Sequence, residues 1–314
     1  MQKVIVLTGQ TATGKTELAL KIAAEQNGEL LNCDSRQIYK DLDIISGKDL
    51  TNNSYKEVEK QDIYSIGYYT FDTPTKPKLW LYDIITPKEY FSSFDYQTCA
   101  LPLIKNILDQ GKTPIIVGGT YFYFYHLLYD VETESIKPNW DLRKKLERES
   151  VENLQNELKK INPTLFQQLN ESEQMNSQRL IRKIEISTEK ADYRQQKLQT
   201  KITLAEKLAM DDLEIEYIGL RFTDKDSELK SIKERVDKRM QEGAVEEVEQ
   251  LLKNGYAEND PGMKTIGYQQ IIQYINGTFS KEQMIQTWIT KEIQYAKRQF
   301  TFMKRDTNIQ WREV

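Results

Sequence analysis

The chain has 314 residues, of which 39% are hydrophobic and 29% are charged, so it can bury the core of one large domain or of two ordinary ones. Its longest apolar runs are too short to span a bilayer and its first residues do not resemble a signal peptide, so we expect a soluble, cytoplasmic protein without membrane contact. A net charge of −4 argues against nucleic acid as the first partner to consider, although such binding depends on where basic residues cluster.

The first 130 residues alternate strand-like and helix-like runs. Strands are predicted at 4–7, 30–33 and 114–117, and helices at 17–25 and 101–110. Residues 79–85 form another apolar stretch, whereas 52–78 are polar and aromatic and are expected to be a loop or an irregular excursion. This alternation predicts an α/β fold whose parallel sheet binds ligands at the carboxyl ends of its strands.

The composition changes after residue 130. From Trp140 to Thr203 the chain is rich in Lys, Glu, Gln and Leu and contains no glycine, which predicts an all-helical insertion over 131–203. A strand signal returns at 214–220, and helices are predicted at 227–241, 244–254, 264–275 and 281–305. We therefore expect a core domain made of 1–130 and 204–314, with the insertion between its two parts.

The first motif fits the phosphate-loop pattern G-x-x-x-x-G-K-[ST] in full, and its residues are Gly9, Gln10, Thr11, Ala12, Thr13, Gly14, Lys15 and Thr16. The glycines let backbone N–H groups point inward, Lys15 adds a positive charge, and Thr16 offers a hydroxyl to Mg²⁺. A strand before the loop and a helix after it are the context that this chemistry requires. The motif predicts binding of a di- or triphosphate and leaves the transferred group open.

Two further motifs follow predicted strands. Asp34 begins Asp-Ser-Arg-Gln at the expected carboxyl edge of the sheet, where its carboxylate could bind Mg²⁺ through water, act as a general base, or cap a helix. Gly118-Gly119-Thr120 could allow close approach of the backbone to a ligand, or could simply be a turn. The residues alone do not choose between these alternatives.

Arg235 and Arg239 are four residues apart and share one face of a predicted helix. Such a pair suits a phosphate. The alternative is a solvated helix face on which the arginines pair with Glu234 and Glu242.

Basic residues recur along the last predicted helix with a spacing of seven, and these are Lys291, Arg298 and Arg305, with Lys297 and Lys304 alongside. Aromatic residues are interleaved with them. This stripe suits a nucleic-acid backbone, but it is equally compatible with a solvated face. The single histidine, His126, lies among aromatic residues and is expected to pack, and Cys33 and Cys99 are expected to be reduced thiols.

Together these segments resemble the tRNA dimethylallyltransferase family, also called tRNA isopentenyltransferase, in its bacterial form. The matching segments occur in the family's order, and they are GQTATGKT, LNCDSRQIYKDLDI, PIIVGGTYFY, QRLIRKIE, ERVDKRM, GAVEEVEQLLKNGY, KTIGYQQIIQYINGTFSKEQ and QYAKRQFTFMKR. The chain departs from the family at Gln10, where proline is usual, at Ala191, where glycine is common, and in the longer segment 53–78.

The resemblance implies transfer of a dimethylallyl group from dimethylallyl diphosphate to the exocyclic amine of the adenine 3′ of the anticodon. It implies Asp34, Thr120 and Arg239 as catalytic residues, the loop from Gly9 to Thr16 as the diphosphate site, and Mg²⁺ held partly by Thr16. We expect a monomer that binds the anticodon stem-loop. The implied tRNA contacts are Asp34, Ser35, Arg36, Gln37, Thr120, Arg143, Gln178, Arg179, Leu180, Ile181, Arg182, Lys264, Thr265, Ile266, Gly267, Tyr268, Gln269, Lys297 and Arg298.

Three other functions remain open at this point. A P-loop kinase acting on a small metabolite could use 131–203 as a lid. An adenylate isopentenyltransferase would share the core but act on a free nucleotide, against which the insertion and the basic helix argue. An RNA-binding NTPase switch would need no catalytic base.

Overall fold

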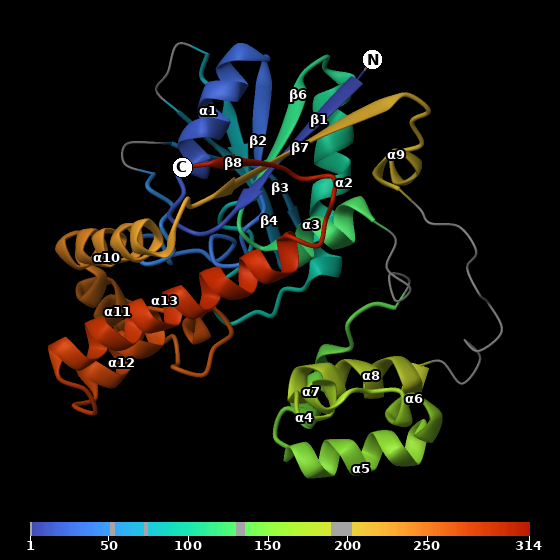
Figure 1. Cartoon of the computed structure of the whole chain (residues 1–314), viewed down its shortest axis with the longest axis vertical. Coiled ribbons are helices and arrows are strands. Elements are labelled where there is room, and N and C mark those ends of the chain that lie inside the picture. Colours follow the sequence, from blue (N-terminus) through green and yellow to red (C-terminus); the bar gives the residue numbers. More distant parts are fainter. Residues whose placement is uncertain (1, 51–53, 72–74, 130–135, 190–202) are drawn as a thin grey trace. The chain divides into compact units, whose positions relative to one another are not determined.

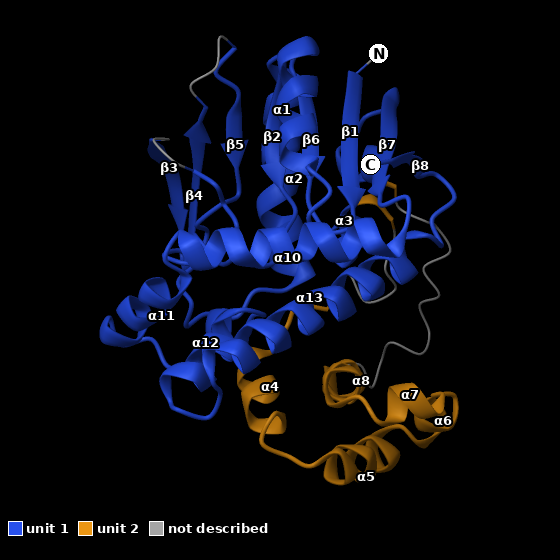
Figure 2. Cartoon of the chain, turned by 60° about the vertical axis from the view of Figure 1, so that its left-hand side comes forward, with its two compact units in different colours: residues 1–127, 204–314 blue, residues 128–203 orange. Residues whose placement is uncertain are grey.

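The computed structural model describes residues 2–50, 54–71, 75–129, 136–189 and 203–314 (Figure 1). The chain divides into two compact units, one made of Met1–Leu127 with Leu204–Val314 and the other of Leu128–Thr203 (Figure 2). The helical insertion was expected at 131–203, and the second unit thus begins three residues earlier and ends at the same residue.

Unit 1 is built on a sheet that has eight strands within the described residues. The strands in chain order are β1 (Gln2–Gly9), β2 (Gly28–Asn32), β3 (Tyr55–Gln61), β4 (Tyr64–Thr70), β5 (Lys78–Trp80), β6 (Thr113–Val117), β7 (Leu213–Arg221) and β8 (Gln310–Glu313). Their order across the sheet is β3-β4-β5-β2-β6-β1-β7-β8. All pairs from β5 to β8 are parallel, and β4 pairs antiparallel with both β3 and β5. The predicted parallel α/β fold is confirmed.

The central strands β1, β2 and β6 carry consecutive buried apolar residues, as expected where both faces of a sheet are covered. Ile5 and Leu7 of β1 pack with Ala19 and Ile22 of α1 (Lys15–Glu25) in one cluster. Side chains alternate along a strand, so Val4 and Val6, which are also buried, belong to the opposite face. Helix α2 (Ser93–Asp109) lies on that side of the sheet (Figure 1).

Within the stretch 52–78, where a loop or an irregular excursion was expected, the described residues Tyr55–Gln61 and Tyr64–Thr70 form the hairpin β3–β4. Strand β3 is an exposed edge of mostly charged residues, so it has no apolar alternation to mark it in the sequence. Strand β4 is stabilised by pairing with β5, where Tyr69 lies opposite Leu79. The short edge strand β8 was likewise not predicted, and it forms only because β7 offers a partner.

The remaining helices of unit 1 are α3 (Tyr121–Leu128), α9 (Leu204–Lys207), α10 (Lys225–Gln241), α11 (Ala244–Lys253), α12 (Tyr268–Ile275) and α13 (Lys281–Met303). Figure 2 shows α10 and α13 crossing the sheet at the ends of its strands. The helix predicted at 264–275 begins only at Tyr268, because Gly262–Lys264 is a separate 3-10 turn and Gly267 has a φ of 96°. The last helix ends at Met303, two residues earlier than predicted.

Unit 2 consists of α4 (Trp140–Leu146), α5 (Val151–Ile161), α6 (Pro163–Gln167), α7 (Glu171–Gln174) and α8 (Ser177–Glu189). It has its own apolar core, in which Leu154 and Leu158 of α5 pack with Leu180, Ile181 and Ile184 of α8. Among the residues described for the whole chain, no helix combines the length and apolar character that crossing a bilayer requires.

Candidate active site

The phosphate-loop motif connects the end of β1 to the start of α1. Gly9 has a φ of 142°, and a Cβ there would lie 2.3 Å from the Leu220 carbonyl oxygen, so only glycine fits beside β7. Gly14 precedes α1 with a φ of 76° and brings no side chain to cap the helix. The first-turn N–H groups of α1 are therefore available to an anion, and the dipole of the helix favours one.

The shape of the loop depends on Gln10, the position where the sequence departs from the family pattern. The backbone carbonyl of Gln10 accepts hydrogen bonds from Thr13 Oγ1 at 2.8 Å and Lys15 Nζ at 2.5 Å. Its side-chain amide donates to Glu228 Oε1 at 2.7 Å and accepts from the Phe222 N–H at 3.1 Å. Gln10 thus ties the loop to the segment between β7 and α10, a role that the proline of the family pattern could not take.

Asp34 lies two residues after the end of β2, and its Oδ1 accepts a hydrogen bond from the backbone N–H of Arg36 at 2.9 Å. No helix begins here, so the helix-cap alternative for Asp34 is wrong. The neighbouring Ser35 N–H donates to Thr120 Oγ1 at 2.9 Å, which joins the loop after β2 to the loop after β6. The structure therefore brings the loops of Asp34 and Thr120 together, because β2 and β6 are neighbouring parallel strands.

The paired glycines allow this close approach. A Cβ on Gly118 would lie 2.1 Å from the Cys33 carbonyl oxygen, and one on Gly119 would lie 2.4 Å from Gln299 Nε2 and 3.4 Å from Asp34 Oδ2. The paired glycines therefore let the backbone pack against neighbouring protein segments at the edge of the site, and their close approach to a ligand stays a prediction.

Of the two arginines of α10, Arg239 is buried, whereas Arg235 is half-buried and bonded to the phosphate loop, which contradicts the solvated-face alternative. Arg239 is 4% exposed, and Arg235 donates to Thr11 Oγ1 of the phosphate loop. Glu234 and Glu242 pair with lysines of the same helix instead. Burial, together with the neighbouring Arg235, lowers the pKa of Arg239 to about 9, and burial also lowers the pKa of Arg235. Two partly desolvated cations beside a phosphate loop are arranged for an anion.

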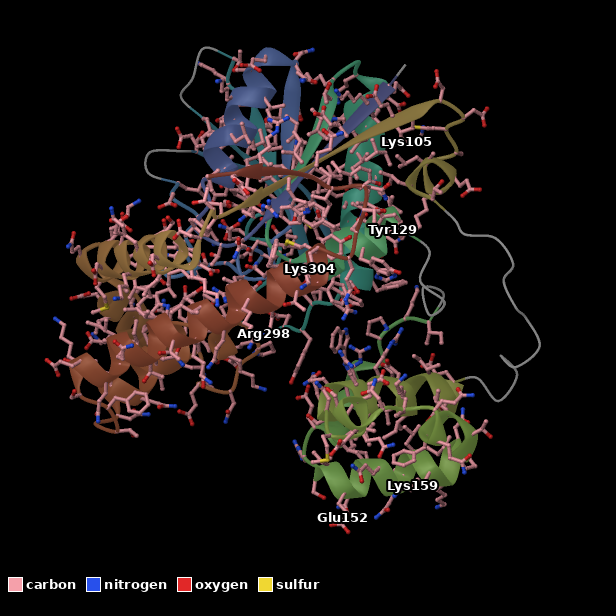
Figure 3. The ribbon with its side chains drawn as sticks, in the orientation of Figure 1. Lys105, Tyr129, Glu152, Lys159, Arg298 and Lys304 are labelled. Atoms are coloured by element: carbon pink, nitrogen blue, oxygen red, sulfur yellow. The ribbon has the colours of Figure 1, made fainter. Side chains whose placement is uncertain are left out.

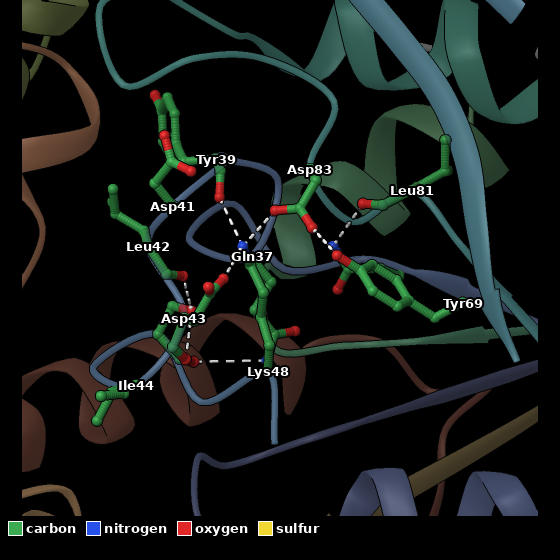
Figure 4. A network of polar contacts seen from close by, with 12 residues as sticks. Gln37, Tyr39, Asp41, Leu42, Asp43, Ile44, Lys48, Tyr69, Leu81 and Asp83 are labelled. Carbon is green, nitrogen blue, oxygen red and sulfur yellow. Dashed lines mark hydrogen bonds and ion pairs between the residues drawn. The ribbon is translucent and has the colours of Figure 1, made fainter. Parts of the chain in front are cut away.

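Residues 34–49 form a loop that lines the same site and is held from behind by a buried lysine (Figure 4). Lys48 Nζ donates to the Tyr39 carbonyl at 2.8 Å and pairs with Asp43 at 2.6 Å and with Asp83, which also accepts the Tyr69 hydroxyl of the hairpin. The loop then reaches Gly47, where a Cβ would lie 2.0 Å from an Arg239 guanidinium nitrogen. This network therefore fixes the position of the loop segment at Gly47, against which Arg239 packs.

These elements enclose a pocket of about 470 Å³. Its polar lining includes Lys15, Thr16, Asp34, Arg235 and Arg239. Burial lowers the pKa of Lys15 to about 8, with Asp34 opposing the shift and Arg235 adding to it. The pocket thus combines several cationic groups with one carboxylate at the predicted position of the base.

The oxygen donors at this pocket fit the Mg²⁺ that the resemblance implies. The hydroxyl of Thr16 and the carboxylates of Asp34 and Asp49 line the pocket beside the phosphate loop. Mg²⁺ prefers oxygen ligands and is commonly held by one or two protein groups together with water and substrate phosphates. Thr16 and Asp49 would hold it, because the carboxylate of Asp34 is the predicted base.

The inner face of α13 contributes Glu292, Tyr295 and Gln299 to the site, and none of the three was among the site residues predicted from the sequence. Gln299 accepts the Thr11 N–H at 3.2 Å and donates to the Gly119 carbonyl at 2.7 Å, so it links the phosphate loop to the paired glycines. Glu292 pairs with Arg36 at 3.0 Å, and the Arg36 guanidinium lies 4.2 Å from the centre of the Tyr295 ring. The signal was present as polar residues at helical spacing on the face opposite the basic stripe.

The basic stripe lies on the solvent side of α13 and just beyond its end. All five of its residues are exposed, and Figure 3 labels two of them, Arg298 and Lys304. The exposed Phe302 lies on the same stretch. The surface is available to a large ligand, and its contact with RNA stays a prediction.

The other predicted tRNA contacts are placed very differently from one another. In unit 2, Gln178 and Arg179 are exposed, whereas Leu180 and Ile181 are buried in the core of that unit. Arg143 and Arg182 both pair with the buried Glu185 of α8. In unit 1, Lys264 is exposed and Thr265, Ile266 and Gln269 are half-buried, whereas Gly267 and Tyr268 are buried. The buried residues can shape an RNA-binding surface but do not present side chains to it.

The fold and the site define this chain as an α/β protein of the P-loop type. A phosphate loop, two arginines and a carboxylate line one pocket in it. Comparison with known proteins narrows this class. A family model described as IPP transferase matches residues 37–306, and a second, described as isopentenyl transferase, matches 2–63. The chain belongs to the IPP transferase family, whose members include the tRNA dimethylallyltransferases.

Individual relatives agree with this assignment. The tRNA dimethylallyltransferase of Acetivibrio thermocellus is 34% identical over 99% of this chain and 91% of its own length, and that of Oceanobacillus iheyensis is 33% identical over 99% and 90%. The tRNA isopentenylpyrophosphate transferase of Bacillus halodurans has 26% sequence identity to this chain. Its crystal structure matches with a TM-score of 0.63 over 100% of this chain and 90% of that one. A eukaryotic dimethylallyltransferase acting on tRNA shares the fold with a TM-score of 0.73 at 24% identity, over 100% of this chain and 74% of that one.

Proposed function

We propose that the protein transfers a dimethylallyl group from dimethylallyl diphosphate to the exocyclic amine of the adenine 3′ of the anticodon in tRNA. The observation that carries the proposal is the single pocket in which Lys15, Arg235 and Arg239 lie together with Asp34. The cations suit a diphosphate, and the carboxylate suits an amine that must lose a proton. Membership of the IPP transferase family supports the same reaction.

In the proposed reaction the diphosphate lies in the phosphate loop, where the N–H groups at the start of α1, Lys15 and the two arginines meet its charge. The amine nitrogen attacks the allylic carbon of the donor, the carbon–oxygen bond to the diphosphate breaks, and Asp34 accepts the proton of the amine. Thr120 is held by the loop of Asp34 and orients the acceptor. Bound Mg²⁺ would add charge neutralisation on the diphosphate.

An aromatic amine is a weak nucleophile, so much of the rate must come from orientation. The adenine has to leave the anticodon loop to reach a pocket at the edge of the sheet, and enzymes commonly solve this by flipping the base out of its stack. We propose that the basic stripe of α13 and the exposed Gln178 and Arg179 of unit 2 bind the stem-loop backbone while the base is inserted. The pocket residues all come from one chain, and we propose that the protein acts as a monomer.

The proposal is tested by analysing tRNA nucleosides by mass spectrometry from cells with and without the gene, and by adding purified protein, Mg²⁺ and the donor to tRNA from the deficient cells. Dimethylallyl-adenosine should disappear with the gene and return in vitro. If the purified protein modified free adenosine monophosphate but not tRNA, it would be an adenylate isopentenyltransferase. Consumption of ATP without RNA would indicate a small-molecule kinase, and either result would contradict the proposal.

A further inference from the structure

Glu292 is a buried carboxylate that the reaction as described does not use. It lies on the inner face of α13 and is 2% exposed. Its Oε1 accepts hydrogen bonds from Arg36 at 3.0 Å and from Trp288 Nε1 at 3.4 Å. Its Oε2 is fully buried and has no hydrogen-bond partner among the described residues. Burying a carboxylate oxygen without a hydrogen-bond partner costs free energy. We therefore expect a favourable electrostatic interaction that offsets this cost.

The surroundings of Glu292 supply such an interaction. Burial would raise its pKa, but Arg36, Arg235 and Arg239 outweigh burial and lower it, so Glu292 stays ionised. Within the cluster the arginines oppose one another, since Arg235 and Arg36 both act to lower the pKa of Arg239. One carboxylate therefore lies close to three arginines, of which Arg36 and Arg239 are buried and Arg235 is half-buried.

The geometry distinguishes the three arginines. Arg36 follows Asp34 in the loop after β2 and is in direct contact with Glu292 and the Tyr295 ring. Arg235 and Arg239 come from α10 and line the diphosphate pocket, and Arg36 does not line it. Glu292 thus contacts the arginine beside the proposed base and acts on the other two only through space.

We propose that Glu292 is a positioning residue: a fixed counter-charge that keeps Arg36 beside Asp34 and weakens the hold of Arg235 and Arg239 on the diphosphate, so that the product can leave. The inference rests on the proposed function, because it assigns the diphosphate to this pocket. Binding a leaving group too tightly adds nothing to the rate of the chemical step and slows release. A counter-charge behind the arginines limits this binding without removing the arginines.

The decisive variant is Glu292→Gln. Glutamine has nearly the same shape and keeps an oxygen that can accept from Arg36 and Trp288, so a purely structural role would be largely preserved. The change removes one negative charge behind the cluster. Calorimetric titration of the full-length protein with inorganic pyrophosphate, without tRNA, should therefore show binding that is tighter by about tenfold, the order expected for one charge at an effective dielectric constant of about 20.

Two control variants test whether the change in pyrophosphate affinity follows the sign and the place of the charge that is removed. Arg36→Met removes a cation and leaves Glu292 free to interact with Arg235 and Arg239, so pyrophosphate should bind more weakly than to the wild type. Glu185→Gln removes a comparable carboxylate that pairs with Arg143 and Arg182 in unit 2, and no residue of that unit lines the pocket. This variant should leave pyrophosphate binding unchanged.

Steady-state kinetics provide a second test. In Glu292→Gln the KM for the donor should fall while kcat does not rise, and inhibition by pyrophosphate should strengthen. Unchanged or weaker pyrophosphate binding in a Glu292→Gln protein with wild-type thermal stability would overturn the proposal, as would equal effects of Glu292→Gln and Arg36→Met. Pyrophosphate binding is measured without any transfer reaction, so failure of the proposed function would appear separately, as wild-type protein that binds pyrophosphate but does not modify tRNA.

Discussion

Replacing Asp34 by asparagine isolates its proposed role as the base. Asparagine is nearly isosteric and can still accept the Arg36 N–H bond that shapes the turn, so the loop after β2 should keep its conformation. Ser35 should keep its bond to Thr120 for the same reason. The variant therefore loses a charge and a proton acceptor but little structure.

The expected cost follows from the two roles of this carboxylate. Loss of a general base typically lowers the rate by about 10² to 10⁴. Asp34 also acts to raise the pKa of Lys15, so in the variant the pKa of Lys15 should fall below about 8 and the donor should bind more weakly at pH 8 than at pH 7. The rate loss should persist at saturating donor, whereas the binding loss should not.

Single-turnover transfer to an anticodon stem-loop with saturating donor measures the first effect, and donor binding at the two pH values measures the second. Binding of the stem-loop itself should stay within a few fold of the wild type, which checks that the fold is intact. A variant whose single-turnover rate stays within about threefold of the wild type would refute the assignment of Asp34 as the base, since the lower limit for losing a base is about 10².

Three further predictions follow from the same geometry. Arg239→Ala should lower kcat/KM more than Arg235→Ala, because the resemblance assigns the diphosphate contact to Arg239; steady-state comparison giving the reverse order would contradict this. Diphosphate affinity should be constant below about pH 8 and fall above it as Lys15 loses its proton, and Lys15→Arg should move that break upward in a pH titration. Stem-loop affinity should weaken with salt, and replacing Lys297 and Arg298 together by alanine should reduce the salt slope by about 0.7–0.9 for each phosphate that is no longer neutralised; an unchanged slope would leave the stripe a solvated face.

The local sequence determined much of the core of unit 1. The phosphate loop, the strand before it and the helix after it are adjacent in the chain, so their geometry follows from glycine conformations and from a short apolar run. Asp34 and Thr120 could be placed for a related reason, because residues that directly follow parallel strands meet at one edge of the sheet. The composition likewise predicted that residues 136–189 are helical.

The tertiary structure decided which polar residues are buried. Arg235 and Arg239 have a pattern that fits a solvated helix face, and only the packing of α10 against the phosphate loop buries Arg239 and brings Arg235 to Thr11. Glu292 and Gln299 are polar residues at helical spacing on α13, but only the crossing of this helix over the ends of the strands buries them at the site. The strands β3 and β8 also depend on a partner, because an edge strand gains its hydrogen bonds from its neighbour and need not carry an apolar face. Local pattern therefore fixes what a segment can form, whereas burial and charge pairing arise from contacts between residues distant in the chain, which no local pattern records.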